Sequence, residues 1–215
     1  MTGKKNIKTV LIDFGGVVAE EGFKAGISAI AEKNDLEPED LIKTAFATIY
    51  ELGFITGKVS EDRFWDALRK SSGIRGTDSE FSEEILSCFI LRPWMLELIS
   101  KLKKKGITFA ILSDQTNWLD ELNQRYDFFN IFDYVFNSFH FGMTKKDPDI
   151  FDKVMQQMNI EQPETVLFID DHLSHIKRAQ SKGLKTIFYT SKDMFLTELE
   201  EYFFLPGYHK RSVTS

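Results

Sequence analysis

The sequence predicts an α/β protein with a doubly wound, Rossmann-like parallel sheet as its core and a helical cap inserted after the first strand. Short apolar runs alternate with amphipathic stretches through most of the chain, a pattern typical of a parallel sheet covered by helices. Between about residues 19 and 91 this alternation stops, and helical patterns follow one another without a convincing strand. We therefore expect a core of residues 1–18 and 92–215 and a cap of residues 19–91.

Five short apolar runs are the predicted strands of the core: residues 9–14, 108–112, 134–136, 165–169 and 186–189. They are almost continuously apolar, which suits strands that are covered on both faces of a sheet. The predicted core helices include residues 94–105, 148–158 and 175–181. The first of these carries apolar residues at helical spacing and ends in lysines before Gly106, a typical helix stop.

The composition indicates a globular protein that binds neither nucleic acid nor membrane. The chain has 215 residues, of which 42% are hydrophobic and 28% charged, and its formal net charge is −6. An acidic chain lacks the basic surface that nucleic-acid phosphates require. Its apolar runs are much shorter than the ~18 residues of a membrane span. The composition leaves the oligomeric state open.

The N-terminal sequence and the cysteine content favour a cytoplasmic location. The first lysines are followed by only three apolar residues before Asp13, too few for a secretory leader. Cys88 is the single cysteine, so it forms no intrachain disulfide, and this fits a reducing compartment. Its apolar neighbours predict a buried small side chain rather than a nucleophile.

Carboxylates follow two of the predicted strands. Asp13 ends the first strand, and Gly15 and Gly16 after it allow a tight turn and a close backbone approach to a ligand. The strand at 165–169 is followed by Asp170 and Asp171, which repel each other unless a cation lies between them. Mg²⁺ prefers such oxygen ligands. A turn or a helix cap is the simpler interpretation of either position taken alone.

Two further strand ends offer groups that bind anions. Ser113 and Asp114 follow the strand at 108–112, where a hydroxyl and free backbone N–H groups could hold an anion. Lys145 precedes a helix that opens at Pro148, and its ammonium could act as a point charge for phosphate. An ordinary loop and a solvated lysine are the alternatives. Ligands of doubly wound sheets bind beyond the carboxyl ends of the strands, so all four positions belong to one predicted site.

Taken in order, these segments resemble the four motifs of the haloacid dehalogenase superfamily, in the branch with a helical cap after the first strand. The four segments are residues 13–18, 111–114, 145–151 and 166–171, and the third has Lys146 where proline is common. The resemblance runs from about residue 8 to residue 190. It implies a hydrolase of this superfamily and leaves its substrate open.

The resemblance implies that Asp13 is a nucleophile that forms an aspartyl-phosphate, which water then hydrolyses. It implies a Mg²⁺ cofactor held by Asp13, the Gly15 carbonyl and Asp171, with Asp170 as a direct or water-mediated partner. Two catalytic residues, Asp13 and Lys145, are therefore expected.

The remaining residues of the expected site bind the substrate. Ser113 and Lys145 would hold the non-bridging phosphoryl oxygens, and Asp114 and Gly16 would lie against the substrate. The expected partner is a small phosphorylated metabolite. His172 and His175 are either partners of the metal carboxylates or simply polar residues at a helix start.

Gly15 is the main departure from the family pattern, which usually has a second Asp at this position to protonate the leaving group. Losing a general acid–base costs on the order of 100- to 10,000-fold in rate. The sequence resembles a sub-branch in which this replacement accompanies sugar-phosphate phosphatase activity. Glu20 and Glu21 are candidate substitutes, although solvated surface glutamates are the simpler interpretation.

The expected function is thus Mg²⁺-dependent removal of phosphate from a small metabolite, with sugar phosphates among the candidates. A 2-haloacid dehalogenase-like hydrolase and a degenerate phosphate- and metal-binding module are the alternatives. A phosphonate-cleaving enzyme would need a cap lysine, for which Lys24 and Lys58 are available. Five aromatic residues either line the substrate pocket or belong to the core: Phe46, Tyr50, Phe54, Trp65 and Trp118.

Overall fold

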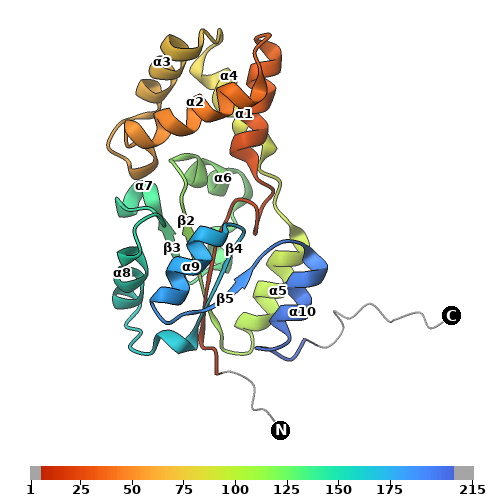
Figure 1. The fold of residues 1–215 in the computed structure, drawn as a ribbon. Helices are drawn as coiled ribbons and strands as arrows, with labels where there is room; N and C mark the ends of the chain where they lie inside the picture. Colours follow the sequence, from red (N-terminus) through yellow and green to blue (C-terminus); the bar gives the residue numbers. More distant parts are fainter. Residues whose placement is uncertain (1–5, 206–215) are drawn as a thin grey trace, which may run out of the picture.

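The computed structural model describes residues 6–205 (Figure 1). Both ends of the predicted core, and the polar tail 209–215 that the sequence predicts to fray, lie outside the described residues. Within them, no helix is both long enough and apolar enough to cross a membrane.

A parallel sheet of five strands forms the core and confirms the predicted fold class. The strands are β1 (Thr9–Ile12), β2 (Thr108–Ser113), β3 (Tyr134–Asn137), β4 (Val166–Asp170) and β5 (Lys185–Phe188). Their order is β3-β2-β1-β4-β5, so β1 is central and the order reverses on either side of it. Each observed strand lies within two residues of its predicted bounds. The first ends at Ile12, which leaves Asp13 and Phe14 beyond the sheet edge.

Helices cover both faces of the sheet. They are α5 (Pro93–Lys103), α6 (Trp118–Tyr126), α7 (Ser138–Phe141), α8 (Asp149–Gln157), α9 (Leu173–Ser181) and α10 (Lys192–Leu199). Alternate residues of β1 point to opposite faces: Val10 and Ile12 join the cluster with α5 and α10, whereas Leu11 joins the cluster with α8 and α9. Two short 3-10 helices, Phe129–Ile131 and Pro163–Thr165, lead into β3 and β4.

Four α-helices occupy the chain between β1 and α5. They are α1 (Gly22–Lys33), α2 (Pro38–Glu51), α3 (Glu61–Ser72) and α4 (Asp78–Cys88), with a 3-10 helix, η1 (Phe54–Thr56), before α3. In Figure 1 they lie beyond the carboxyl ends of the strands. The two connecting segments run antiparallel: the amide of Glu20 donates to the Ile90 carbonyl, and the amide of Arg92 donates to the Val18 carbonyl, both at 2.9 Å. The division into core and cap stays a prediction, which this arrangement supports.

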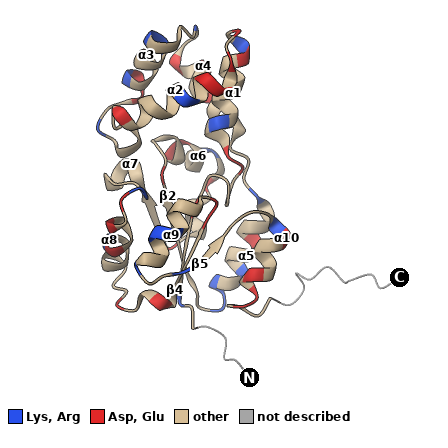
Figure 2. Cartoon of the chain, viewed as in Figure 1, with Lys and Arg blue, Asp and Glu red and all other residues tan. Residues whose placement is uncertain are grey.

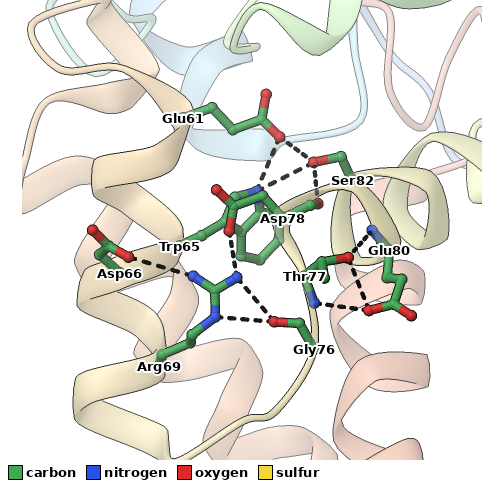
Figure 3. A network of polar contacts seen from close by, with 9 residues as sticks. All are labelled: Glu61, Trp65, Asp66, Arg69, Gly76, Thr77, Asp78, Glu80 and Ser82. Carbon is green, nitrogen blue, oxygen red and sulfur yellow. Dashed lines mark hydrogen bonds and ion pairs between the residues drawn. The ribbon is translucent and has the colours of Figure 1, made fainter.

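The turn between α3 and α4 is fixed by polar contacts (Figure 3). The Arg69 guanidinium donates to the Gly76 carbonyl at 3.0 and 3.2 Å and forms an ion pair with Asp78. Thr77 and Glu80 make a reciprocal capping box at the start of α4. The capping box satisfies the amides of Thr77 and Glu80 at the start of α4, and the Arg69 contacts tie α3 to the turn before α4.

Charged residues of both signs are mixed along the helices (Figure 2). Cys88 lies at the end of α4 and is half-buried, whereas Phe89 next to it is buried. The expectation of a buried side chain at this position was therefore wrong.

Candidate active site

Asp13 begins a tight turn at the carboxyl end of the central strand. Its amide donates to the Ile169 carbonyl of β4 at 2.9 Å, which continues the sheet pairing by one residue. Gly16 has a φ of +80°, and a Cβ at this position would lie 2.1 Å from Asp171 Oδ2. Only glycine therefore lets the turn after Asp13 approach Asp171 so closely.

Lys145 joins two of the predicted site carboxylates. Its Nζ lies 2.7 Å from Asp13 Oδ2 and 2.7 Å from Asp170 Oδ2, and its side chain is only 1% exposed. The amide of Lys145 donates to Asp114 Oδ1 at 2.8 Å, which ties the loop before α8 to the end of β2. Burial acts to lower the pKa of Lys145, but the carboxylates around it hold the pKa above its ordinary value. The ammonium is therefore charged.

Asp170 is fully buried and has more hydrogen-bond and ion-pair partners than the other two site carboxylates, Asp13 and Asp171. Besides Lys145, it accepts hydrogen bonds from the His172 amide at 2.7 Å and contacts His175 Nδ1 at 3.1 Å. Burial alone would raise the pKa of Asp170, but Lys145 and His175 hold it below its ordinary value. His175 thus supports a site carboxylate, whereas His172 is exposed and contributes its backbone amide.

Asp13 has a different electrostatic environment. Burial raises the pKa of its carboxyl well above the ordinary value, an effect that Lys145 opposes and the Asp170 charge reinforces. One ammonium thus pairs with Asp13 and Asp170, and the neighbouring Asp171 adds a third carboxylate to the cluster. A further cation would balance the charge of this cluster and favour the ionised form of Asp13.

The donor set fits a hard divalent cation. Asp13, Asp170 and Asp171 each offer an oxygen, and these oxygens lie within 4.8 Å of one another. Asp171 Oδ1 is buried and has no hydrogen-bond partner among the described residues, although buried polar atoms are almost always paired. Carboxylate oxygens at this spacing suit Mg²⁺, which binds oxygen and keeps several waters.

These groups lie at the base of a pocket of about 670 Å³ between the strand ends and the cap. Of the predicted site residues, six line it: Asp13, Gly15, Ser113, Asp114, Lys145 and Asp171. The other two, Gly16 and Asp170, do not line it. Gly16 lies against Asp171, and Asp170 is buried below the base. A pocket of this volume suits a small molecule.

Cap residues form the opposite wall of the pocket. Phe46 and Tyr50 line it, whereas Phe54, Trp65 and Trp118 are fully buried and pack against one another. Tyr50 also contacts the core, because Lys146 Nζ lies 3.2 Å from the centre of its ring.

The candidate lysines and glutamates of the cap region differ in whether they line the pocket. Lys24 lines the pocket, whereas Lys58 does not. Glu20 is exposed and pairs with Arg92 at 2.8 and 2.9 Å. Glu21 is half-buried, lines the pocket and caps α1 by accepting the Lys24 amide at 2.9 Å.

Two residues that line the pocket, Gln115 and Arg178, and the buried Ser138 near them were not predicted from the sequence. Gln115 lies beside Gly15, and the buried Ser138 donates to the Ile55 carbonyl of the cap at 2.7 Å. Arg178 also lines the pocket, and its Nη1 is buried without a hydrogen-bond partner among the described residues. Arg178 follows His175 by three residues and so shares its face of α9, the one signal that could have identified it.

Similarity to known proteins identifies the family of this chain. The family model of haloacid dehalogenase-like hydrolases matches residues 7–194, and the chain belongs to this family.

Three relatives illustrate the range of similar proteins. Bifunctional epoxide hydrolase 2 of Rattus norvegicus is 29% identical over 218 residues, which cover 91% of this chain. The chain spans only 38% of the length of that protein. Sesquiterpene phosphatase astK of Aspergillus oryzae is 25% identical over 153 residues, which cover 69% of this chain and 76% of the phosphatase. A HAD family enzyme of Bacteroides thetaiotaomicron, in its magnesium complex, is 25% identical with a TM-score of 0.71, covering 87% of this chain and 96% of that one.

Proposed function

We propose that this protein is a Mg²⁺-dependent phosphatase that acts on a small phosphorylated metabolite through an aspartyl-phosphate at Asp13. The observation that carries the proposal is the ion-paired cluster of Asp13, Lys145 and Asp170, with Asp171 beside it, at the base of a pocket closed by the cap. The A. oryzae relative is named a phosphatase, and the B. thetaiotaomicron relative binds magnesium, which supports both parts of the proposal.

In the proposed reaction, a carboxylate oxygen of Asp13 attacks phosphorus while the bond to the ester oxygen breaks. Lys145 lies 2.7 Å from Asp13, so its charge can hold both the nucleophile and a non-bridging phosphoryl oxygen. Ser113 lines the same pocket and would donate its hydroxyl to a second phosphoryl oxygen. Water then attacks the phosphorus of the aspartyl-phosphate, which releases phosphate and restores Asp13.

Mg²⁺ bound by Asp13, Asp171 and the Gly15 carbonyl, with Asp170 beside them, would neutralise charge on the phosphoryl group. The unpartnered Asp171 oxygen supports this assignment. The same carboxylates argue against the dehalogenase alternative, because an uncompensated cluster would repel an anionic haloacid.

The proposal is tested by phosphate release from a panel of sugar phosphates, other small phosphate esters and p-nitrophenyl phosphate. We expect release with Mg²⁺ and none with EDTA. Asp13→Asn keeps the size of the side chain but removes the nucleophile, so activity should fall by about 10⁴-fold or more. Asp40→Asn, an exposed aspartate of α2, is the matched control and should retain activity.

Each alternative function has its own outcome in this experiment. Binding of phosphate and Mg²⁺ without turnover of any ester would indicate a degenerate binding module. Release of halide from 2-haloacids that is insensitive to EDTA would indicate a dehalogenase. Mass spectrometry of acid-quenched enzyme should find a phosphorylated peptide that contains Asp13, and its absence during turnover would contradict the aspartyl-phosphate.

A further inference from the structure

Gly15 leaves the proposed reaction without a proton donor for the leaving oxygen. In an in-line displacement, the ester oxygen departs on the side of phosphorus opposite Asp13, which faces the cap. Lys145 lies at the base of the pocket, paired with Asp13 and Asp170, and Asp170 is buried beneath it, so neither is free to protonate this oxygen. A donor must therefore come from the part of the chain that covers the pocket.

Glu21 lies where such a donor is needed. It is the N-cap residue of α1 and follows directly on the two connecting segments that pair between core and cap. The hydrogen bonds of these segments and the start of α1 therefore fix its backbone. Its half-buried side chain lines the same pocket as Asp13. Burial raises the pKa of the Glu21 carboxyl, which increases the fraction that carries a proton.

The ring of Phe89 lies between Gly15, where the family usually has its acid, and Gly22, which follows Glu21. One edge of the ring would lie 3.5 Å from a Cβ at Gly15. The other edge packs so closely on Gly22 that a Cβ there would lie 2.4 Å from it. Gly22, the residue next to Glu21, therefore lies one aromatic ring away from the side chain that Gly15 lacks, and Glu21 lines the same pocket as Gly15.

The neighbouring Glu20 cannot serve in this way. Its carboxylate is exposed and accepts two hydrogen bonds from Arg92, whose guanidinium also donates to the carbonyls of Gly16 and Val17. Arg92 lowers the pKa of Glu20, which favours the ionised form, and Glu20 does not line the pocket.

Three other protonatable groups in the pocket are less suitably placed than Glu21. Asp114 accepts the Lys145 amide at the base of the pocket, on the same side as Asp13. His172 follows Asp171 directly on the core side. Tyr50 belongs to the cap, but burial raises the pKa of its phenol far above neutrality, and such a group is a weak acid.

We propose that Glu21 is the general acid and base of this site, which takes over the role that Gly15 cannot perform. As the Asp13–phosphorus bond forms and the phosphorus–ester bond breaks, the Glu21 carboxyl transfers its proton to the leaving oxygen. In the second step the Glu21 carboxylate removes a proton from the attacking water as the Asp13–phosphorus bond breaks. The inference rests on the proposed phosphatase function.

Glu21→Gln tests the inference, because glutamine keeps an oxygen that can cap α1 but cannot give up a proton. An alkyl phosphate has a poor leaving group, so its kcat/KM should fall by about 100- to 10,000-fold. The p-nitrophenolate leaving group of p-nitrophenyl phosphate needs no protonation, so the rate of phosphoryl transfer to Asp13 should remain within about fivefold of wild type. Hydrolysis of the aspartyl-phosphate should slow, because the base that activates water is missing. A burst of p-nitrophenol equal to the enzyme concentration should therefore appear.

Two variants complete the experiment. Glu20→Gln is the matched control, one residue away, and should leave both substrates unaffected. Gly15→Asp added to Glu21→Gln should restore alkyl phosphate hydrolysis, because a Cβ at position 15 meets only ordinary contacts, at 3.5 and 3.9 Å.

The inference is overturned if Glu21→Gln lowers kcat/KM equally for the alkyl phosphate and for p-nitrophenyl phosphate, or if Asp114→Asn produces the burst and Glu21→Gln does not. Both outcomes leave an active, Asp13-dependent enzyme. Failure of the proposed function is distinguishable from either one, because wild-type protein would then hydrolyse neither substrate.

Discussion

At the scale of single residues, charge balance governs the site. Lys145 is one buried cation beside Asp13, Asp170 and Asp171. Paired buried charges are tolerated when hydrogen bonds satisfy them, and the His172 amide and His175 do this for Asp170. Asp171 has an oxygen without such a partner among residues 6–205, so the unbalanced charge lies on the side where we place Mg²⁺.

Gly15 and Gly16 in the turn after Asp13 differ in the space available for a side chain, so their substitutions should have different effects. Gly16→Ala forces a side chain into the left-handed region, which costs about 1–2 kcal/mol. It also places the new methyl group against Asp171. We expect lower stability in urea, weaker Mg²⁺ binding by calorimetry and lower phosphatase activity.

Gly15→Ala is the control for this change, because its Cβ meets only ordinary contacts. It should retain Mg²⁺ affinity and stability close to wild type. Equal losses in the two variants would show that the contact of Gly16 with Asp171 is not what holds the metal carboxylate.

At the scale of elements, the cap helices are fixed at their ends and by an aromatic cluster. Trp118 of α6 lies against Phe54 and Trp65 of the cap, with ring centres 5.6 and 5.8 Å apart. Ser138 of α7 donates to the cap carbonyl of Ile55 and accepts the amide of Gln115, a residue that lines the pocket. The cap is therefore held in a defined position above the strand ends.

The capping box of α4 gives a prediction at this scale. Thr77→Ala removes the side-chain oxygen that accepts the Glu80 amide, so the free energy of unfolding should fall by about 1 kcal/mol. Urea denaturation followed by circular dichroism measures this change. Ser79→Ala, an exposed change in the same helical turn, should cost little, and a larger loss there would contradict a specific role for the cap.

At the scale of the whole molecule, cap and core share one hydrophobic cluster. Val10 and Ile12 of the sheet belong to the same cluster as Ile30, Phe64 and Trp65 of the cap helices. A continuous core favours cooperative unfolding, because the cap cannot separate without exposing large apolar side chains. Binding at the base of the pocket should therefore stabilise the entire chain.

Thermal unfolding with and without Mg²⁺ tests this expectation. At 100 times the dissociation constant, binding to the folded state contributes about 2.7 kcal/mol. For a chain of this length, that corresponds to a rise in Tm of about 5–10 °C. Asp171→Asn should abolish the rise, and its Tm in EDTA should not fall below that of wild type, because one of three repelling charges is gone. A similar rise in both proteins would contradict the proposed metal site.

Sequence alone determined the strands, the sheet class and the order of the strand-end residues, because strand periodicity and turn chemistry are local. It placed Asp13, Ser113, Lys145 and Asp171 at one sheet edge. Tertiary structure decided which of the two adjacent carboxylates is buried, since Asp170 alone faces Lys145.

Tertiary structure also decided between neighbours that a sequence cannot separate. Glu20 and Glu21 are the same residue type, yet Glu20 pairs with Arg92 whereas Glu21 lines the pocket. Likewise, Tyr50 lines the pocket while Trp118 is buried. These outcomes depend on how the cap returns to the core through contacts between residues far apart in the chain, which no local pattern specifies.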